Sequence, residues 1–128
     1  DVYRTYKEGG SLPAGCTALV WGQPLMGRQP DDPPNPKLEA LPVAWTKTWR
    51  TSDGREARVF QCTMGSDDDF RSAGLRRLVI NAAYWGMGME DAISPTRSVE
   101  TVGPYEPLRT GFDYAKIGVT AKPVSAYR

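Results

Sequence analysis

The sequence predicts an α/β fold, on three observations. Residues 43–50 alternate side chains between two faces, and residues 57–64 carry the β-branched and aromatic side chains of a buried strand. Asp53-Gly54 lies between the two segments and is a strong signal for the turn of a β-hairpin. From Ser72 onward, apolar residues recur with the 3.6-residue period of an amphipathic helix. We therefore expect a β-hairpin, one long helix and, after it, an extended C-terminal tail.

The region before the hairpin predicts one short strand between two irregular segments. Residues 1–14 contain Gly9-Gly10 and Pro13, which is typical of an extended surface segment. Residues 17–22 form an apolar run of strand length, and Pro24 ends it. Residues 26–42 are rich in proline and low in hydrophobicity, which predicts a partly polyproline-like loop and no helix.

The predicted helix has an apolar face that is wide enough to contact two neighbours. Ile80 and Ala83 extend that face, so we expect the helix to lie between a sheet and a second segment. Arg76 and Arg77 are expected in solvent, with an anion site as the alternative, and Asn81 is placed to bond a loop backbone group. Gly86 to Met89 is expected to cap the helix. The five residues that define the face are Leu75, Leu78, Val79, Ala82 and Trp85.

The predicted binding site is the loop between the second hairpin strand and the helix. Such strand-to-helix loops bind ligands in α/β folds, because free backbone N–H groups and the helix dipole point there. The plain alternative is that the aspartates cap the helix and favour its first turn. They lack the alternating ligands and the final glutamate of a calcium loop, so we expect no metal and no cofactor. The predicted ligand-binding residues here are Gly65, Ser66, Asp67 and Asp68.

Three tryptophans in strand patterns are further candidates for a binding site. An indole ring matches the apolar face of a pyranose, so Trp21, Trp45 and Trp49 are potential sugar-stacking platforms. Tryptophans in strands are more often part of a core, and that alternative stays open. Trp45 is our first candidate, because it lies near the start of a hairpin strand beside Thr46.

Composition excludes several classes of chemistry. The 128 residues include no histidine, so this chain holds no Ser-His-Asp triad, no Cys-His pair and no histidine metal motif. The net charge of +1 does not favour nucleic acid, and no apolar run approaches the length of a membrane span. Cys16 and Cys62 form no CxxC motif, and whether they pair is left open.

Several motifs resemble the C-terminal half of trehalose-utilization (ThuA-like) domains, which are class I glutamine-amidotransferase-like α/β domains. The residues that carry the resemblance are Pro42–Thr46, Arg58–Phe60, Thr63–Gly65 and Gly74–Trp85. The resemblance implies a flavodoxin-like layered fold whose first half lies outside this sequence. Residues 1–95 would then be the C-terminal portion of that domain and residues 96–128 a tail that packs on it. Where many members carry a histidine after the turn, this chain has Ser66.

Two functions follow from the resemblance and the residues together. The first is a carbohydrate-associated domain of an exported, periplasmic or extracellular bacterial protein, which binds or processes a sugar derivative near Gly65. The second is a non-catalytic interaction module of a larger multi-domain protein. The sequence leaves enzymatic activity open. We expect the helix face with Ile80, Ala83 and Met87, or the strand at 18–22, to contact the missing half of the domain or a partner subunit.

Overall fold

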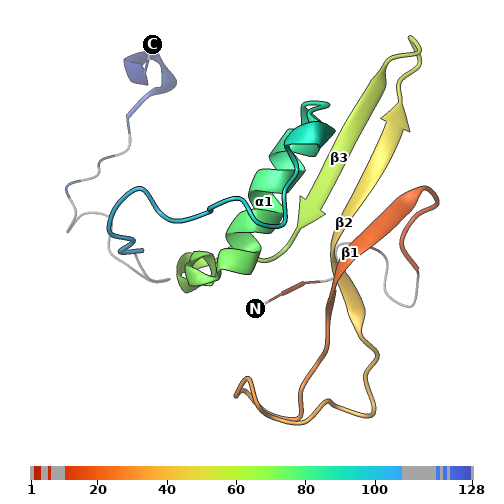
Figure 1. Ribbon diagram of the computed structural model, residues 1–128, viewed down its shortest axis with the longest axis vertical. Coiled ribbons are helices and arrows are strands. Elements are labelled where there is room, and N and C mark those ends of the chain that lie inside the picture. Colours follow the sequence, from red (N-terminus) through yellow and green to blue (C-terminus); the bar gives the residue numbers. More distant parts are fainter. Residues whose placement is uncertain are drawn as a thin grey trace.

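The computed structural model describes residues 2–3, 6, 11–107, 118, 120 and 122–127. Its centre is a three-stranded sheet in the order β1-β2-β3, built from β1 (Cys16–Gly22), β2 (Leu41–Arg50) and β3 (Glu56–Cys62). Both neighbouring pairs are antiparallel. A helix, α1 (Ala73–Gly86), follows β3 and lies along one face of the sheet (Figure 1). The predicted α/β class, the hairpin and the long helix are therefore confirmed.

The β2–β3 hairpin forms where the alternation and the Asp-Gly turn predict it. Its register pairs Ala44 with Cys62 and Arg50 with Glu56 without interruption. Gly54 closes the turn with a φ of 83°, a conformation that costs glycine little. The hydroxyl of Thr51 and then the guanidinium of Arg55 bond the Asp53 carboxylate and lower its pKa.

Helix α1 ends at both termini with local hydrogen bonds. Ser72 is the N-cap, and its hydroxyl accepts a bond from the backbone N–H of Leu75. At the other end Gly88 has a φ of 73°, and the N–H of Met89 donates to the carbonyl of Tyr84 at 2.9 Å. This is a Schellman motif, so the predicted glycine cap is confirmed.

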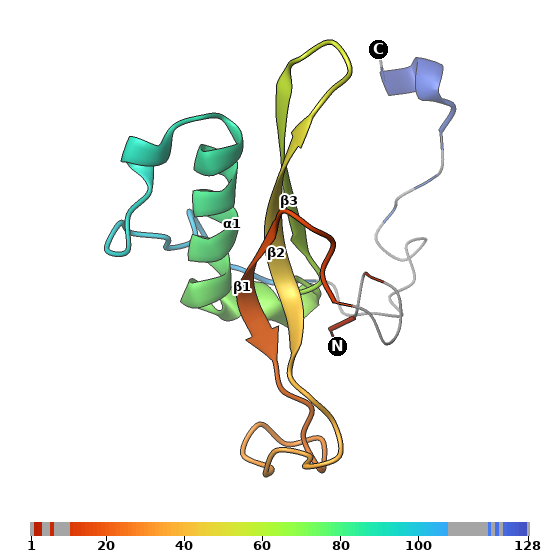
Figure 2. The ribbon, with the colours of Figure 1, turned by 90° about the vertical axis from the view of Figure 1, so that its right-hand side faces the viewer.

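The helix lies between the sheet and a second segment, as its wide apolar face predicts. After α1 and the short 3-10 helix η2 (Glu90–Ala92), residues 94–107 return along the side of α1 that faces away from the sheet (Figure 2). We call residues 94–107 the tail segment. Its Val99 is only 5% exposed, which places part of the small core outside the sheet. Beyond it the structure describes a last 3-10 helix, η4 (Val124–Tyr127). Phe112 and Tyr114, which the sequence predicts to pack the tail on the domain, lie outside the described residues.

The two faces of the sheet have different surroundings. Thr46 lies close to α1, where it lines a hollow with Leu78 and Trp85. Because side chains alternate along a strand, Trp45 and Trp49 point to the opposite face, which we call the far face. Trp49 is 55% exposed there. The core in the described part of the chain consists of Val43, Ala44, Leu75 and Val99, and Pro42 of β2 is buried beside it.

The two cysteines are free and lie apart in the sheet. Cys16 is in register with Lys47, and Cys62 is in register with Ala44, on the other face of β2. Since Lys47 and Ala44 point to opposite faces, the two thiols do not face each other and no disulfide joins them.

Gly65 is a position where the backbone conformation and the neighbouring ring both disfavour a side chain. It has a φ of 121°, and a Cβ added there would lie 3.1 Å from the ring of Phe70. We expect Gly65→Ala to lower the free energy of unfolding by about 1–3 kcal/mol, measured by urea denaturation. Gly86→Ala is the control, because a Cβ at the end of α1 meets nothing within 4 Å. That substitution should change stability by no more than about 1 kcal/mol; equal losses in both variants would contradict the strain at Gly65.

Candidate functional site

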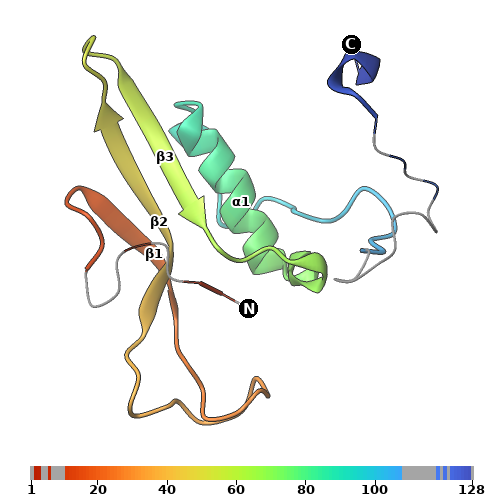
Figure 3. The same cartoon turned by 180° about the vertical axis from the view of Figure 1, so that it is seen from behind.

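The acidic loop after β3 is held together by its own aspartates. One carboxylate oxygen of Asp69 accepts from the backbone N–H groups of both Gly65 and Ser66, each at 3.0 Å. A carboxylate oxygen of Asp67 accepts from the N–H of Asp68 at 2.8 Å. The loop then forms a 3-10 helix, η1 (Asp67–Arg71), before α1 begins (Figure 3). The aspartates therefore stabilise the start of η1, whereas Ser72 caps α1.

The tail segment reaches this loop from the other side. The hydroxyl of Tyr105 donates to the backbone carbonyl of Asp67 at 2.6 Å. The Arg71 guanidinium lies 5.8 Å from the centre of the Tyr105 ring and forms an ion pair of 2.8 Å with Asp68. The hydrogen bond that Arg71 donates to the Asp68 carboxylate raises the pKa of Arg71. The tail therefore stabilises one side of the loop without covering all of it.

A hollow of about 510 Å³ lies beside the loop, at the start of α1. Asp68 and Asp69 supply its polar wall, and Met64 and Leu75 contribute apolar surface. Of the predicted site residues, Asp68 alone lines this hollow. The complete lining is Val2, Met64, Asp68, Asp69, Ser72 and Leu75.

The structure does not bring Trp45 to this hollow. Trp45 lies on the far face of the sheet, between Ala18 of β1 and Gln61 of β3. Gly65, Ser66 and Asp67 lie in the loop itself, where their backbone groups take part in the bonds described above. A ligand role for these residues stays a prediction.

The geometry supports binding more readily than catalysis. Within the described part of the chain, no group of three histidine, cysteine, aspartate or glutamate side chains is arranged to hold a metal ion. The carboxylates of Asp68 and Asp69 line the hollow but are already engaged by Arg71 and by backbone N–H groups. A general base needs an acceptor oxygen within reach of the proton that it removes, so these engaged carboxylates suit binding better.

Arg76 has a role that the sequence did not predict. Its guanidinium donates to the carbonyls of Val99 at 2.6 Å, of Phe70 at 2.6 Å and of Arg71 at 2.9 Å. The side chain is only 15% exposed, so the expectation that it lies in solvent was wrong. The three carbonyls accept hydrogen bonds from guanidinium N–H groups that would be costly to bury without a partner. No local pattern signals the interaction, because Val99 lies 23 positions along the chain.

Two neighbouring side chains of α1 also bond the tail segment. Arg77 donates to the carbonyl of Arg97 at 2.5 Å, so it too serves the tail. The Asn81 amide donates to the carbonyl of Ser94 at 3.5 Å, as expected of a residue placed to satisfy a loop. The Arg97 guanidinium stacks 5.0 Å from the ring centre of Tyr84 and donates to its hydroxyl at 2.6 Å.

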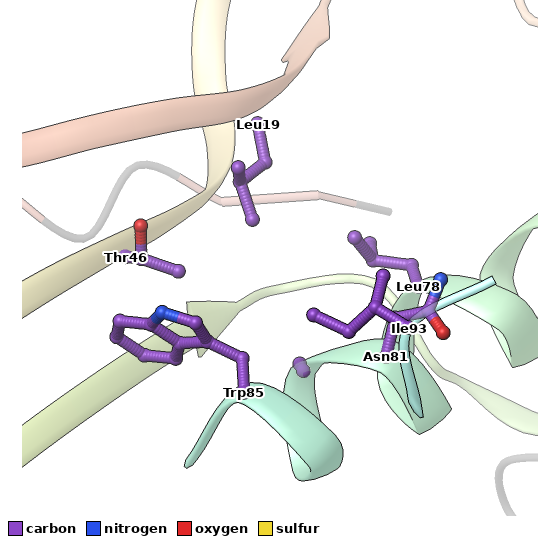
Figure 4. Close-up of a pocket in the computed structure, with 7 residues that line it drawn as sticks. Leu19, Thr46, Leu78, Asn81, Trp85 and Ile93 are labelled. Carbon is purple, nitrogen blue, oxygen red and sulfur yellow. The ribbon is translucent and has the colours of Figure 1, made fainter. Parts of the chain in front are cut away.

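A second hollow, of about 390 Å³, lies between α1 and the sheet (Figure 4). Leu19 of β1 points into it from the sheet side, opposite Leu78 and Ile93 (Figure 4). Trp85 forms the end near Thr46, and the guanidinium of Arg58 stacks 5.4 Å from the ring centre of Trp85. Arg58 also forms an ion pair with Glu90. The pKa of the Glu90 carboxyl is lowered, mainly by a hydrogen bond from its own backbone N–H and to a smaller extent by the hydrogen bond from Arg58.

Comparison with protein-family models, with curated proteins and with solved structures finds no match. In the described part of the chain, none of the helices has the length and apolar character that crossing a membrane requires.

The contacts of Arg76 lead to a direct test. We expect Arg76→Met to lower the free energy of unfolding by about 1–3 kcal/mol, because it leaves the partly buried carbonyls of Phe70 and Val99 without a donor. Trypsin should also cleave after Arg97 about tenfold faster, since the tail segment opens more often. Urea denaturation and mass spectrometry of the digest measure the two effects. Arg50→Met, at the exposed end of β2, is the control; if it has the same effects, Arg76 does not hold the tail.

Proposed function

We propose that this chain is an interaction module that completes a larger α/β assembly by binding another polypeptide through its uncovered sheet. The observation that carries the proposal is the amount of apolar surface left open on the far face. A non-catalytic role also agrees with the engaged carboxylates and the absence of histidine.

The exposed surface is larger than a compact chain of this size would leave. The accessible surface is 10,099 Å². A compact monomer of 14.1 kDa exposes ~6,700 Å². Large apolar side chains of the described sheet, Leu19, Trp21, Trp49 and Val59, contribute to this exposed surface.

The apolar residues of the far face indicate where a partner would bind. Trp49 and Val59 are 55% and 41% exposed. Trp21 is 60% exposed and lines a hollow with Ala18, which is in register with Trp45. The Lys47 ammonium lies 5.4 Å from the centre of the Trp49 ring, so the surface combines aromatic and charged groups. Exposed aromatic side chains are enriched at the interaction sites of soluble proteins.

The partner that we propose is the other half of a flavodoxin-like domain, on the basis of the resemblance to ThuA-like domains. In such layered folds both faces of the sheet are covered. Among the residues that the structure describes, α1 covers one face of the antiparallel sheet and no helix packs on the other (Figure 2). A second layer, supplied in cis by the same precursor or in trans by a subunit, would bury Trp21 and Trp49.

The isolated chain gives the test. We expect its mass to rise with concentration in size-exclusion chromatography with light scattering, and an anilinonaphthalene dye to brighten on binding it. Trp49→Lys should reduce both effects severalfold, because it removes apolar area and adds charge. Val102→Lys is the control, since Val102 is fully exposed in the tail segment.

A dispersed monomer at high concentration that leaves the dye dark would contradict the proposal. The chain would then be a small domain that is stable without a partner.

A second candidate function is carbohydrate binding at the hollow beside the acidic loop. Asp68 supplies a carboxylate there next to the apolar surface of Met64 and Leu75, a combination that suits the polar edge and apolar face of a sugar. The resemblance to trehalose-utilization domains supports the same class of ligand. This candidate leaves open whether a bound sugar is processed.

Calorimetric titration with disaccharides, trehalose first, and with their keto derivatives tests this candidate. We expect saturable heat and amide shifts at Ser66 and Asp68. Asp68→Asn should weaken binding about tenfold, as loss of a charged hydrogen-bond partner does. Asp53→Asn is matched, because Asp53 is also an exposed carboxylate paired with an arginine. No heat with any of these sugars would remove the candidate.

A further inference from the structure

A groove between α1 and β1 offers a second surface for a partner. The inference drawn from it rests on the proposed function. The 390 Å³ hollow in Figure 4 and a neighbouring hollow of about 500 Å³ share Leu78 and Asn81. Together they follow α1 from Gly74 to Trp85, a length of about 17 Å at 1.5 Å per residue. We call this continuous surface the α1–β1 groove.

The groove exists because one helix is too narrow for three strands. The backbone of α1 comes close to that of β3 but not to those of β2 and β1. Strands lie about 4.8 Å apart, so β1 is roughly 10 Å from β3. Packed helices lie 8–10 Å apart. A second helix beside α1 would therefore lie directly over β1.

The β1 strand is shaped for such contact. Its pairing with β2 is interrupted between Ala18 and Val20 and again between Val20 and Trp21. Leu19 and Val20 are consecutive, yet both line the groove, because the irregular pairing turns them to the same side. Leu19 is 45% exposed, a large apolar residue with little cover on the helix side of the sheet.

We propose that the α1–β1 groove binds an amphipathic helix of the partner polypeptide. Its length suits about three helical turns, whereas β1 is an edge of the three-stranded sheet and gives the groove no outer wall to enclose a small ligand. A helix there would also cover that edge, which natural proteins seldom leave open. Arg77 lines the end of the groove near Gly74, so the helix carries an acidic residue at that end.

The test uses the whole chain and a designed peptide as the probe. The peptide has about 18 residues, leucine at the i, i+3, i+4 and i+7 positions of one face, and glutamate placed to meet Arg77. A second peptide has the same composition with leucine at alternate positions. We expect the helical peptide alone to bind saturably and to shift the NMR signals of Leu19, Leu78 and Ile93.

Two variants separate this inference from the proposed function. Leu19→Lys should weaken binding of the helical peptide at least about tenfold, since it places a charge in the groove. Val59→Lys should leave binding unchanged, because Val59 is similarly exposed but lies on the far face, in register with Lys47.

Three outcomes would overturn the inference. One is that the folded chain shows no NMR shift at ~1 mM of the helical peptide, a concentration that would reveal even a Kd of about 1 mM. Another is equal binding of both peptides or shifts confined to the far face. The third is loss of self-association in Leu19→Lys, which would assign the groove to a second copy. The proposed function would survive the first outcome if the chain still associates through Trp49.

Discussion

The position of α1 depends on the guanidinium of Arg76. Its three backbone acceptors belong to two other elements, η1 and the tail segment. Arg77 and Asn81 add two further bonds from α1 to the tail segment, whereas the helix contacts the sheet through β3. Charged donors to carbonyls are stronger than neutral ones, and this fork is largely shielded from water. The tail segment therefore forms part of the fold, and its Val99 belongs to the small core.

The same arrangement explains why so much apolar surface stays open. The tail segment packs on the outer side of α1, and α1 packs on the sheet at β3. Both therefore protect the part of the sheet that holds Phe60 and Arg58. The strand β1 and the far face receive little of it, as the exposure of Leu19 and Trp49 shows. These are the two surfaces on which the proposed interaction module would bind its partner.

Local patterns in the sequence were sufficient for the elements themselves. The alternation of residues 43–50, the Asp-Gly turn and the helical period after Ser72 depend on side chains a few positions apart, and all three predictions are confirmed. The capping glycines after Gly86 are equally local. The α/β class followed from these elements, whereas the flavodoxin-like layering rests on the resemblance and stays a prediction.

For the candidate site too, the sequence determined the local elements and the tertiary structure decided the long-range contacts. The sequence by itself determined that the acidic loop joins β3 to a helix, because strand and helix periods meet at Gly65. Only the tertiary structure decided that Asp69 is bonded within the loop, that Trp45 lies on the other face, and that Arg76 is shielded instead of solvated. These contacts join residues far apart in the chain or depend on where a neighbouring element ends. Their geometry is set by packing, which leaves no period in the sequence.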